Sequence, residues 1–394
     1  MIKDKIQELA GKIYNDVVGY RHHIHANPEL SFKEFQTSLF IKEKLTAWGI
    51  EYVDMANTGV VGLIKGAIPS DKVIALRADM DALPIHEAND KPYRSKNQGV
   101  MHACGHDVHS SSLLGTAYIL SQLKNEFAGT IKLVFQPAEE LLPGGASIMI
   151  KEGVLENPKP DAIVGQHVMP MIETGKVGFR SGIYMASTDE LYVTVTGKGG
   201  HGAQPHQNID PVLITAHIIV ALQQIVSRNA DPRLPSVLSF GKVNANGATN
   251  IIPNEVKLEG TFRTLNEEWR NEAHKLMKKM AEGIAESMGG SCYFDIHRGY
   301  PFLINEEKLT ANAREFATDY LGAENVIDLD IWMAAEDFAY YSQVTDACFY
   351  RLGTGNAAKG TTYSVHTPNF DIDEDALKTS TGLMAYIALK QLGN

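Results

Sequence analysis

The sequence predicts an α/β protein of two domains: a large domain with a mainly parallel sheet, and a smaller ferredoxin-like α+β domain inserted into it. Up to about residue 184, short apolar strands alternate with helical stretches, an order typical of a parallel sheet covered by helices on both faces. Between residues 185 and 298 the order becomes strand, helix, strand, strand, helix, strand, which is the split βαβ arrangement. The 394 residues leave room for both, since a domain typically takes about 100 to 200 residues.

The first part of the large domain, residues 1–184, is predicted to open with an amphipathic helix. Apolar residues recur there at intervals of three or four: Ile2, Ile6, Leu9, Ile13 and Val17. The elements expected after it are a helix over 32–48, a strand over 72–78, a helix over 110–123, a strand over 130–136, a helix over 145–152 and a strand over 161–167.

The inserted domain, residues 185–298, and the second part of the large domain, residues 299–394, complete the prediction. The insertion is expected to contain a strand over 190–196, a helix over 211–227, strands over 236–243 and 256–265, a helix over 267–288 and a strand over 291–297. The helix–strand alternation then resumes with a helix over 306–321, a strand over 347–352 and a helix over 374–392.

The composition of the chain indicates which partners and which cellular compartment to expect. The chain is 44% hydrophobic and 21% charged, as is typical of a globular protein, and its net charge of −11 disfavours nucleic acid or an anionic membrane as a partner. No apolar run approaches the roughly 20 residues that span a bilayer, and the N-terminus lacks the apolar core of a signal peptide. Three cysteines are too few for a disulfide framework and fit a reducing compartment. We therefore expect a cytoplasmic protein.

The segment Met101–His109 is the densest in potential metal ligands and follows a strand that ends near Asp79 and Asp81. It holds five of them: His102, Cys104, His106, Asp107 and His109. In an extended chain, Cys104 and His106 would lie on one face, and thiolate and imidazole both suit zinc. The alternative to a metal site is that Cys104 is an ordinary buried cysteine and that the histidines cap a helix or lie on the surface.

Further candidate ligands follow later strands. Glu139 and Glu140 leave a strand in divergent directions, so one can bind an ion while the other faces a water; a solvated surface pair is the alternative. His167 and His366 are lone histidines, and a lone histidine is more often structural. A full set would be Cys104, His106, Glu140, His167 and His366. Because five ligands exceed the needs of one tetrahedral ion, the set suggests two ions.

The glycine-rich segment Gly197–Gly202 matches the G-x-G-x-x-G pattern of dinucleotide-binding sites, but its context does not. Pro205 and the polar residues after it delay the next helix to about Asp210, and no βαβ unit follows. The glycines instead allow the main chain to approach a ligand and direct His201 towards it, or they form a purely structural turn. Signatures of serine hydrolases, HExxH metallopeptidases and P-loop proteins are absent from the sequence.

These segments resemble the M20 metallopeptidase family, and most closely its amidohydrolase branch of N-acyl-amino-acid, hippurate and plant auxin-conjugate hydrolases. The matching segments run in order along nearly the whole chain: His25–Ser31, Arg77–Pro84, Met101–His109, Phe135–Glu140, Gly197–His206, Ala335–Phe338 and Val365–Thr367. The resemblance implies a catalytic domain that binds two divalent ions, zinc or manganese, with cobalt or nickel as further candidates. It also implies that the inserted domain is a satellite through which the chain forms a homodimer or a higher homo-oligomer.

The resemblance assigns a role to each candidate residue. It makes Glu139 the general base and gives the metal ligands as Cys104, His106, Glu140, His167 and His366. It implies that His201 reaches the active site of a partner subunit, and that Asn250 and Arg263 bind substrate. Many M20 peptidases have a His-x-Asp ligand motif where this chain has Asp79-Met80-Asp81. We therefore expect these two aspartates to orient the site instead of binding metal.

The predicted activity is hydrolysis of the amide bond of N-acylated amino acids, giving a carboxylate and a free amino acid. Arg263 would bind the amino acid's carboxylate, because a guanidinium offers a planar bidentate match. A dipeptidase or carboxypeptidase acting on small peptides is the nearest alternative. A catalytically silent metal-binding or metabolite-binding protein is disfavoured, since binding alone would need no second carboxylate beside Glu140.

Overall fold

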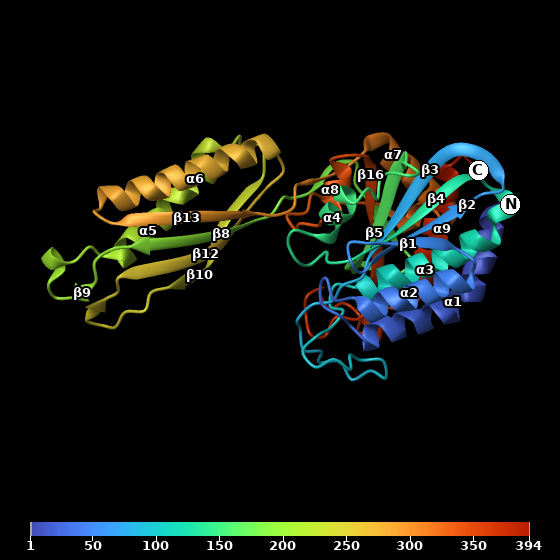
Figure 1. Cartoon of the computed structure of the whole chain (residues 1–394), viewed down its shortest axis with the longest axis horizontal. Helices are drawn as coiled ribbons and strands as arrows, with labels where there is room; N and C mark the ends of the chain where they lie inside the picture. Colours follow the sequence, from blue (N-terminus) through green and yellow to red (C-terminus); the bar gives the residue numbers. More distant parts are fainter. Residues whose placement is uncertain (1, 394) are drawn as a thin grey trace. The chain divides into compact units, whose positions relative to one another are not determined.

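The computed structural model describes residues 2–393 and divides them into two compact units (Figure 1). The larger unit runs to Tyr184 and resumes over Ile304–Ile331 and from Asp337 onward. The smaller unit comprises Met185–Leu303 and the short segment Trp332–Glu336. The chain therefore leaves the larger unit and returns to it.

An eight-stranded sheet forms the centre of the larger unit. Its spatial order is β1 (Glu51–Met55), β2 (Gly59–Lys65), β4 (Ala128–Gln136), β3 (Ile68–Asp79), β5 (Ala162–Glu173), β16 (Asp346–Gly355), β6 (Val177–Phe179) and β15 (Val326–Asp328). The four central strands β4, β3, β5 and β16 run parallel to one another. Antiparallel pairs join β1 to β2, β2 to β4 and β16 to β6. The sheet is mainly parallel, as predicted.

Helices cover this sheet. They are α1 (Ile2–Ala26), α2 (Phe35–Ala47), α3 (His106–Gln122), α4 (Gly145–Lys151), α7 (Glu307–Leu321), α8 (Ala339–Ser342) and α9 (Asp375–Gln391). The predicted apolar stripe of α1 is buried through Ile6, Ile13 and Val17. Helix α3 is buried along most of its length and packs against both α1 and α9. Short 3₁₀ turns occupy Lys124–Glu126, Ala323–Asn325 and Ala357–Lys359.

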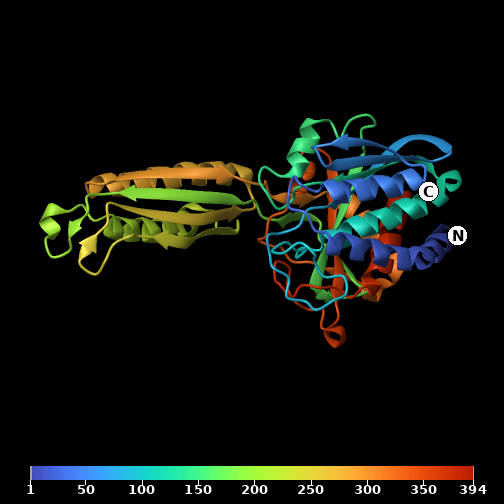
Figure 2. The same ribbon diagram turned by 60° about the horizontal axis from the view of Figure 1, so that its bottom comes forward.

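The smaller unit has a four-stranded antiparallel sheet in the order β10 (Ser236–Asn244), β12 (Glu255–Thr264), β8 (Asp189–Thr196) and β13 (Ser291–Arg298) (Figure 2). Strand β8 alternates buried and exposed residues, with Leu191, Val193 and Val195 directed into the core. Helices α5 (Pro211–Gln224) and α6 (Glu267–Ser287) pack on these side chains. Strand order and connections are those of a ferredoxin-like fold, which confirms the predicted fold class.

Several short elements were not predicted from the sequence. They include β7 (Gly182–Met185) paired with β14 (Leu303–Asn305), β9 (Gly200–His201) paired with β11 (Ile251–Ile252), a 3₁₀ turn at Pro205–Gln207 and a π-helical turn at Ile225–Asn229. Strands β1, β2, β6 and β15 were also missed. Strand β1 is exposed along almost its whole length and β6 has three residues, so neither shows the alternation that marks a half-buried strand.

Candidate metal centre

The carboxyl ends of β3 and β4, the middle of the neighbouring strand β5 and the start of α3 form the candidate site. Asp79 ends β3, Gln136 ends β4, and His167 lies in β5. Gly105 precedes α3 in a left-handed backbone conformation with a φ of 83°. A Cβ atom on Gly105 would lie 2.5 Å from Val168 Cγ2, so glycine is required where this turn approaches β5.

Cys104 and His106 converge for a different reason from the one that the sequence suggested. An extended chain would place both side chains on one face, with the helix starting near residue 110. In the structure α3 begins at His106, and the left-handed Gly105 turns the chain between the two residues. Both side chains are buried. The convergence therefore depends on a helix start and its glycine instead of on a strand.

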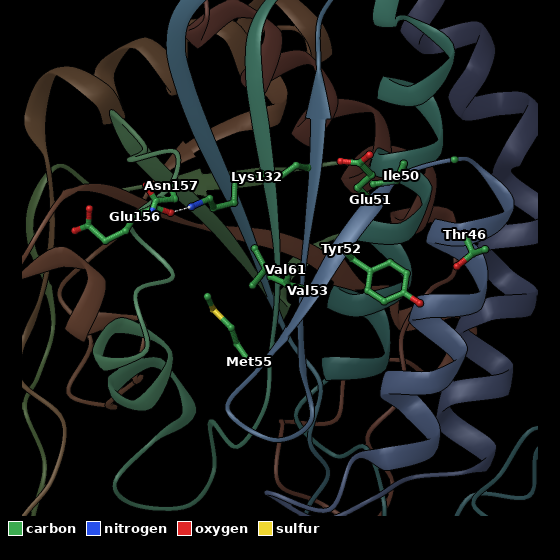
Figure 3. Close-up of a pocket in the computed structure, with 12 residues that line it drawn as sticks. Thr46, Ile50, Glu51, Tyr52, Val53, Met55, Val61, Lys132, Glu156 and Asn157 are labelled. Carbon is green, nitrogen blue, oxygen red and sulfur yellow. Dashed lines mark hydrogen bonds between the residues drawn. The ribbon is translucent and has the colours of Figure 1, made fainter.

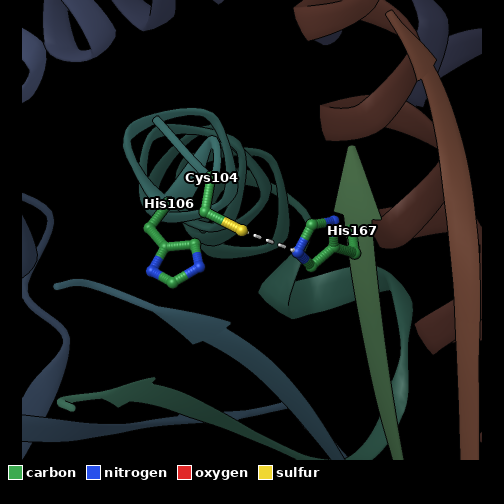
Figure 4. Close-up of side chains that lie close together, drawn as sticks. All are labelled: Cys104, His106 and His167. Atoms are coloured by element: carbon green, nitrogen blue, oxygen red, sulfur yellow. Dashed lines mark hydrogen bonds between the residues drawn. The ribbon is translucent and has the colours of Figure 1, made fainter. Parts of the chain in front are cut away.

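The donor atoms of the five predicted ligands lie close together. Cys104 Sγ is 3.4 Å from His167 Nε2 (Figure 4) and 3.3 Å from His366 Nε2. Glu140 Oε1 lies 3.2 Å from His366 Nε2 and 4.0 Å from His106 Nε2. The main-chain N–H of His366 donates to Ala103 O at 2.7 Å, which ties this late segment to the Met101–His109 segment.

The donors fall into two groups that share one sulfur atom. Cys104, His106 and His167 form one group, and Cys104, Glu140 and His366 form the other, with the donor atoms of each group within 4.8 Å of one another. His106 Nε2 and Glu140 Oε1 are buried and make no hydrogen bond, although His366 Nε2 lies near the latter. Thiolate, imidazole and carboxylate ligands together suit a divalent transition metal. The residues therefore fit a site for two ions.

The electrostatics of the site favour a cation. Burial lowers the pKa of His106, but the carboxylates of Asp79 and Asp81 outweigh it and raise that pKa to about 10. Burial, together with the charge of Arg351, holds the pKa of His167 well below its usual value. His167 is therefore neutral at physiological pH, which is the form that binds a metal.

Asp81 holds the ligand-bearing segments in place through hydrogen bonds. Its Oδ1 accepts from the main-chain N–H of Glu139 at 3.0 Å and lies 3.2 Å from His106 Nδ1. Its Oδ2 accepts from the N–H of Glu140 at 3.0 Å and from Ser31 Oγ at 2.6 Å. Both oxygens are engaged with the segments that carry candidate ligands and with Ser31, and the role of Asp81 in orienting the site stays a prediction.

Asp79 and His109 form a second supporting chain. Asp79 Oδ2 accepts from Arg77 Nη1 at 2.5 Å, and Asp79 Oδ1 is 2.6 Å from His109 Nδ1. His109 Nε2 accepts from the main-chain N–H of Val168 at 2.9 Å, so its proton lies on Nδ1. Both ring nitrogens are thus occupied, and His109 supports the middle of β5, beside His167, instead of acting as a ligand.

Two other potential ligands of the Met101–His109 segment, Asp107 and His102, belong to none of the groups of potential metal ligands among the described residues. Asp107 accepts from Arg21 Nε at 3.0 Å and lies 2.8 Å from His25 Nδ1. His102 is buried, its ring nitrogens make no hydrogen bond, and burial lowers its pKa to about 4. Sequence reasoning also missed Asp337, which accepts from Arg77 Nη2 at 2.7 Å; its only signal was its place in the Ala335–Phe338 motif.

The remaining predicted residues belong to the smaller unit. His201 is exposed on β9, and its Nδ1 accepts from the main-chain N–H of Ala203 at 3.1 Å. Asn250 is also exposed. Arg263 is partly buried on β12, where its Nη1 donates to Met333 O at 3.2 Å, and burial lowers its pKa. The catalytic and binding roles of these residues stay predictions.

A pocket of about 630 Å³ in the larger unit has none of the candidate metal ligands in its lining. Figure 3 shows the residues that line it. Apolar side chains such as Tyr52, Val53 and Met55 line it. Lys132 also reaches its wall, but the ammonium group donates to three main-chain carbonyls of residues 154–158 at 2.7, 2.7 and 2.8 Å. Since these bonds use all three ammonium protons, Lys132 has none left for a ligand.

Replacing Asp81 by asparagine is expected to weaken metal binding by about 10- to 100-fold. The amide NH₂ cannot accept the hydrogen bond from Glu140 N–H or His106, so one ligand-bearing segment loses its support. Competition with a chromophoric chelator measures the affinity. Asp54→Asn is the matched control, because Asp54 is exposed and pairs with Lys42. Equal affinities for Asp81→Asn and the unmodified protein would contradict the supporting role.

Comparison with known proteins identifies the family. The model of peptidase family M20/M25/M40 matches residues 75–390. The chain belongs to this family. The resemblance inferred from the sequence motifs is thereby confirmed, and the ligand cluster at the strand ends is the candidate centre of an M20 hydrolase.

The relatives of this M20 hydrolase include enzymes named as amidohydrolases and enzymes named as peptidases. The N-acyl-L-amino acid amidohydrolase of Geobacillus stearothermophilus is 44% identical over 309 residues, covering 78% of this chain and 83% of the relative. The thermostable carboxypeptidase 2 of Saccharolobus solfataricus is 38% identical, covering 97% of this chain and 99% of the relative. A Bacillus subtilis structure described as a dinuclear metal binding M20 peptidase matches with a TM-score of 0.83 at 34% identity, covering 97% and 99%.

Proposed function

We propose that this M20 hydrolase is an amidohydrolase that cleaves N-acylated amino acids to a carboxylate and a free amino acid with the help of two divalent ions. The observation that carries the proposal is the pair of ligand groups sharing Cys104, with Glu139 beside them as an additional carboxylate. The 44% identity to an N-acyl-L-amino acid amidohydrolase supports this substrate class.

Five residues would hold the two ions: Cys104, His106, Glu140, His167 and His366. When bound, the ions supply Lewis-acid polarisation and lower the pKa of a water molecule. Glu139 is 6% exposed and its Oε2 lies 3.9 Å from His106 Nε2, at the edge of the ligand cluster. There it accepts the proton of the attacking water and later gives it to the leaving amine.

Residues of the smaller unit would complete the site in this proposal. A neutral His201 carries its proton on Nε2, because Nδ1 accepts from Ala203 N–H, and can donate it to the oxyanion. Arg263 would bind the carboxylate of the amino acid, and Asn250 would contact the substrate through its amide. A local cation is needed because a protein with a net charge of −11 repels anionic substrates.

The proposed metals are zinc or manganese, with cobalt or nickel as further candidates. A thiolate that belongs to both ligand groups favours zinc, whereas the carboxylates also suit manganese. Elemental analysis of the purified protein decides between them. A cytoplasmic location is part of the proposal, since the Cys104 thiolate would require reducing conditions.

We further propose that the smaller unit mediates homodimerisation. Helix α5 presents Val212, Leu213 and Val220 to solvent, and Val220 is 74% exposed. The segment Pro211–Asn229 is long and apolar enough to cross a membrane by length and composition, but its inner face packs on the sheet of its own unit. A second copy covering the outer face explains both features. Analytical ultracentrifugation tests this, and a stable monomer at micromolar concentration would count against it.

A panel of substrates tests the proposed activity. The panel contains N-acetyl and N-benzoyl amino acids together with unmodified dipeptides, and each assay uses protein of measured metal content. We expect hydrolysis of the N-acyl compounds at the higher kcat/KM. Faster hydrolysis of dipeptides would favour the alternative, a dipeptidase or carboxypeptidase. The relative from Saccharolobus solfataricus is named a carboxypeptidase, which is why dipeptides are included in the panel. Failure of every compound with two metals bound would overturn the proposal.

A further inference from the structure

The turn that carries Glu139 and Glu140 has an unusual backbone. It follows β4, and its second residue, Ala138, has a φ of 51°, in the left-handed region that residues with a Cβ atom rarely adopt. Such a conformation is strained and persists only where the surroundings impose it. Contacts that hold Ala138 therefore also fix the directions in which the next two side chains leave the turn.

Two buried carboxylates hold three consecutive main-chain N–H groups of this turn. Glu34 Oε1 accepts from Ala138 N–H at 2.9 Å. Asp81 accepts from the next two, Glu139 and Glu140, each at 3.0 Å. Asp81 also touches His106, so its link to the metal site is direct. Among the described residues of the turn, only the left-handed Ala138 donates a hydrogen bond to Glu34.

The remaining contacts of Glu34 anchor its carboxylate firmly. The side chain is 0% exposed. Its Oε1 also accepts from the main-chain N–H of Phe32 at 2.9 Å, and its Oε2 accepts from Thr58 Oγ1 at 2.7 Å. Although Glu34 is the N-cap residue of α2, its side chain makes no capping hydrogen bond to that helix. Stabilisation of its own helix thus does not explain why a carboxylate is buried here.

Burying this carboxylate has an electrostatic cost. Burial raises the pKa of Glu34 to about 7, while the hydrogen bond from Thr58 lowers it and the charge of Asp81 raises it. Among the described residues, no cation forms an ion pair with Glu34. Hydrogen-bond acceptance, and not charge pairing, is therefore what this side chain contributes.

We propose that Glu34 is a positioning residue of the metal centre, which holds Ala138 in the left-handed conformation and thereby aims Glu139 and Glu140. Without the acceptor at Oε1, the main chain at Ala138 can relax to negative φ and rotate the two carboxylates out of their positions. The inference deepens the proposed function and rests on it for the roles of Glu139 and Glu140.

Three variants of Glu34 and one control test the inference. Glu34→Ala removes the acceptor, and Glu34→Asp shortens its reach. Glu34→Gln keeps an amide oxygen for Phe32 and Ala138, while the Thr58 hydroxyl can turn to accept from the amide. The matched control is Glu29→Ala. Glu29 likewise accepts three hydrogen bonds, from Gln36 N, Thr37 N and Thr37 Oγ1 at 3.1, 2.9 and 3.0 Å, but none from the turn.

The readouts are kcat and KM for an N-acyl amino acid and the visible absorption spectrum of protein loaded with Co²⁺. Glu34→Ala and Glu34→Asp are expected to lower kcat by about 10- to 100-fold with little change in KM, and to shift the cobalt spectrum at unchanged metal content. Glu34→Gln should stay close to the unmodified enzyme in both readouts. Glu29→Ala should lower thermal stability without changing kcat or the spectrum.

The outcomes that overturn the inference are distinct from failure of the proposed function. Unchanged kcat and spectrum in Glu34→Ala would overturn it, as would an equal loss in Glu29→Ala or a failure of Glu34→Gln to preserve activity. If Glu34→Ala does not fold, Glu34→Asp decides by the same measurements. If the unmodified protein hydrolyses no N-acyl amino acid, the proposed function fails, and the cobalt spectra alone still decide whether Glu34 positions the metal site.

Discussion

Replacing Glu139 by glutamine is expected to lower kcat by about 100- to 10,000-fold while both metal ions stay bound. Glutamine keeps the shape of the side chain but cannot accept the proton of the attacking water. Its main-chain N–H still donates to Asp81, so the turn should keep its conformation. Steady-state kinetics combined with elemental analysis measures the two quantities on the same preparation.

The neighbouring residue gives a contrasting control for this prediction. Glu140→Gln should lower the metal content, because Glu140 Oε1 belongs to the group formed with Cys104 and His366. If Glu139→Gln loses activity but retains its metal, and Glu140→Gln loses both, the role of Glu139 in proton transfer is distinguished from the role of Glu140 as a metal ligand. Retained turnover in Glu139→Gln would refute its assignment as the general base.

Much of the fold could be predicted because its main elements carry strong local patterns. The apolar stripe of α1 and the alternation in β8 are visible in the sequence and point to buried faces. Strand β1 is missing from the prediction because its side chains are almost all exposed, so only its pairing with β2 makes it a strand. Although only three residues separate β1 from β2, this pairing leaves no alternating pattern in the sequence of β1 itself.

That the five candidate ligands lie close together was predictable for a related reason. Cys104 and His106 lie in one short segment, and Glu140 and His167 each follow an apolar strand, so position alone suggested that they meet at one sheet edge. The supporting residues gave no such signal. Glu34 lies 104 residues before the Ala138 that it holds, and a single glutamate at a helix start is unremarkable in a sequence.

The start of α3 shows why local geometry resists prediction. Three polar residues and Val108, from His106 to His109, read as a loop or an extended segment, because their burial cannot be seen in the sequence. In the structure all four residues are buried, and Asp79 and Arg21 form hydrogen bonds with His109 and Asp107, respectively. Burying these polar groups would be strongly destabilising without the hydrogen bonds that those distant partners provide.

Replacing His201 by alanine is expected to lower kcat by about 100-fold or more, if its Nε2–H stabilises the oxyanion. His201 and His206 are both exposed and lie in the same segment, which makes His206→Ala the matched control. The control should keep nearly full activity. An effect of His201→Ala confined to KM would indicate a role in substrate binding alone and would contradict the assignment.

Mixing two inactive variants tests whether His201 acts in the active site of a partner subunit. In a dimer of one Glu139→Gln chain and one His201→Ala chain, a site that combines residues from both chains has an intact Glu139 and an intact His201. Random exchange of equal amounts makes half of the dimers mixed, so recovery of about a quarter of the full activity is expected. If each chain supplied its own His201, every site would lack one of the two groups, and mixing would restore nothing even after subunit exchange is demonstrated.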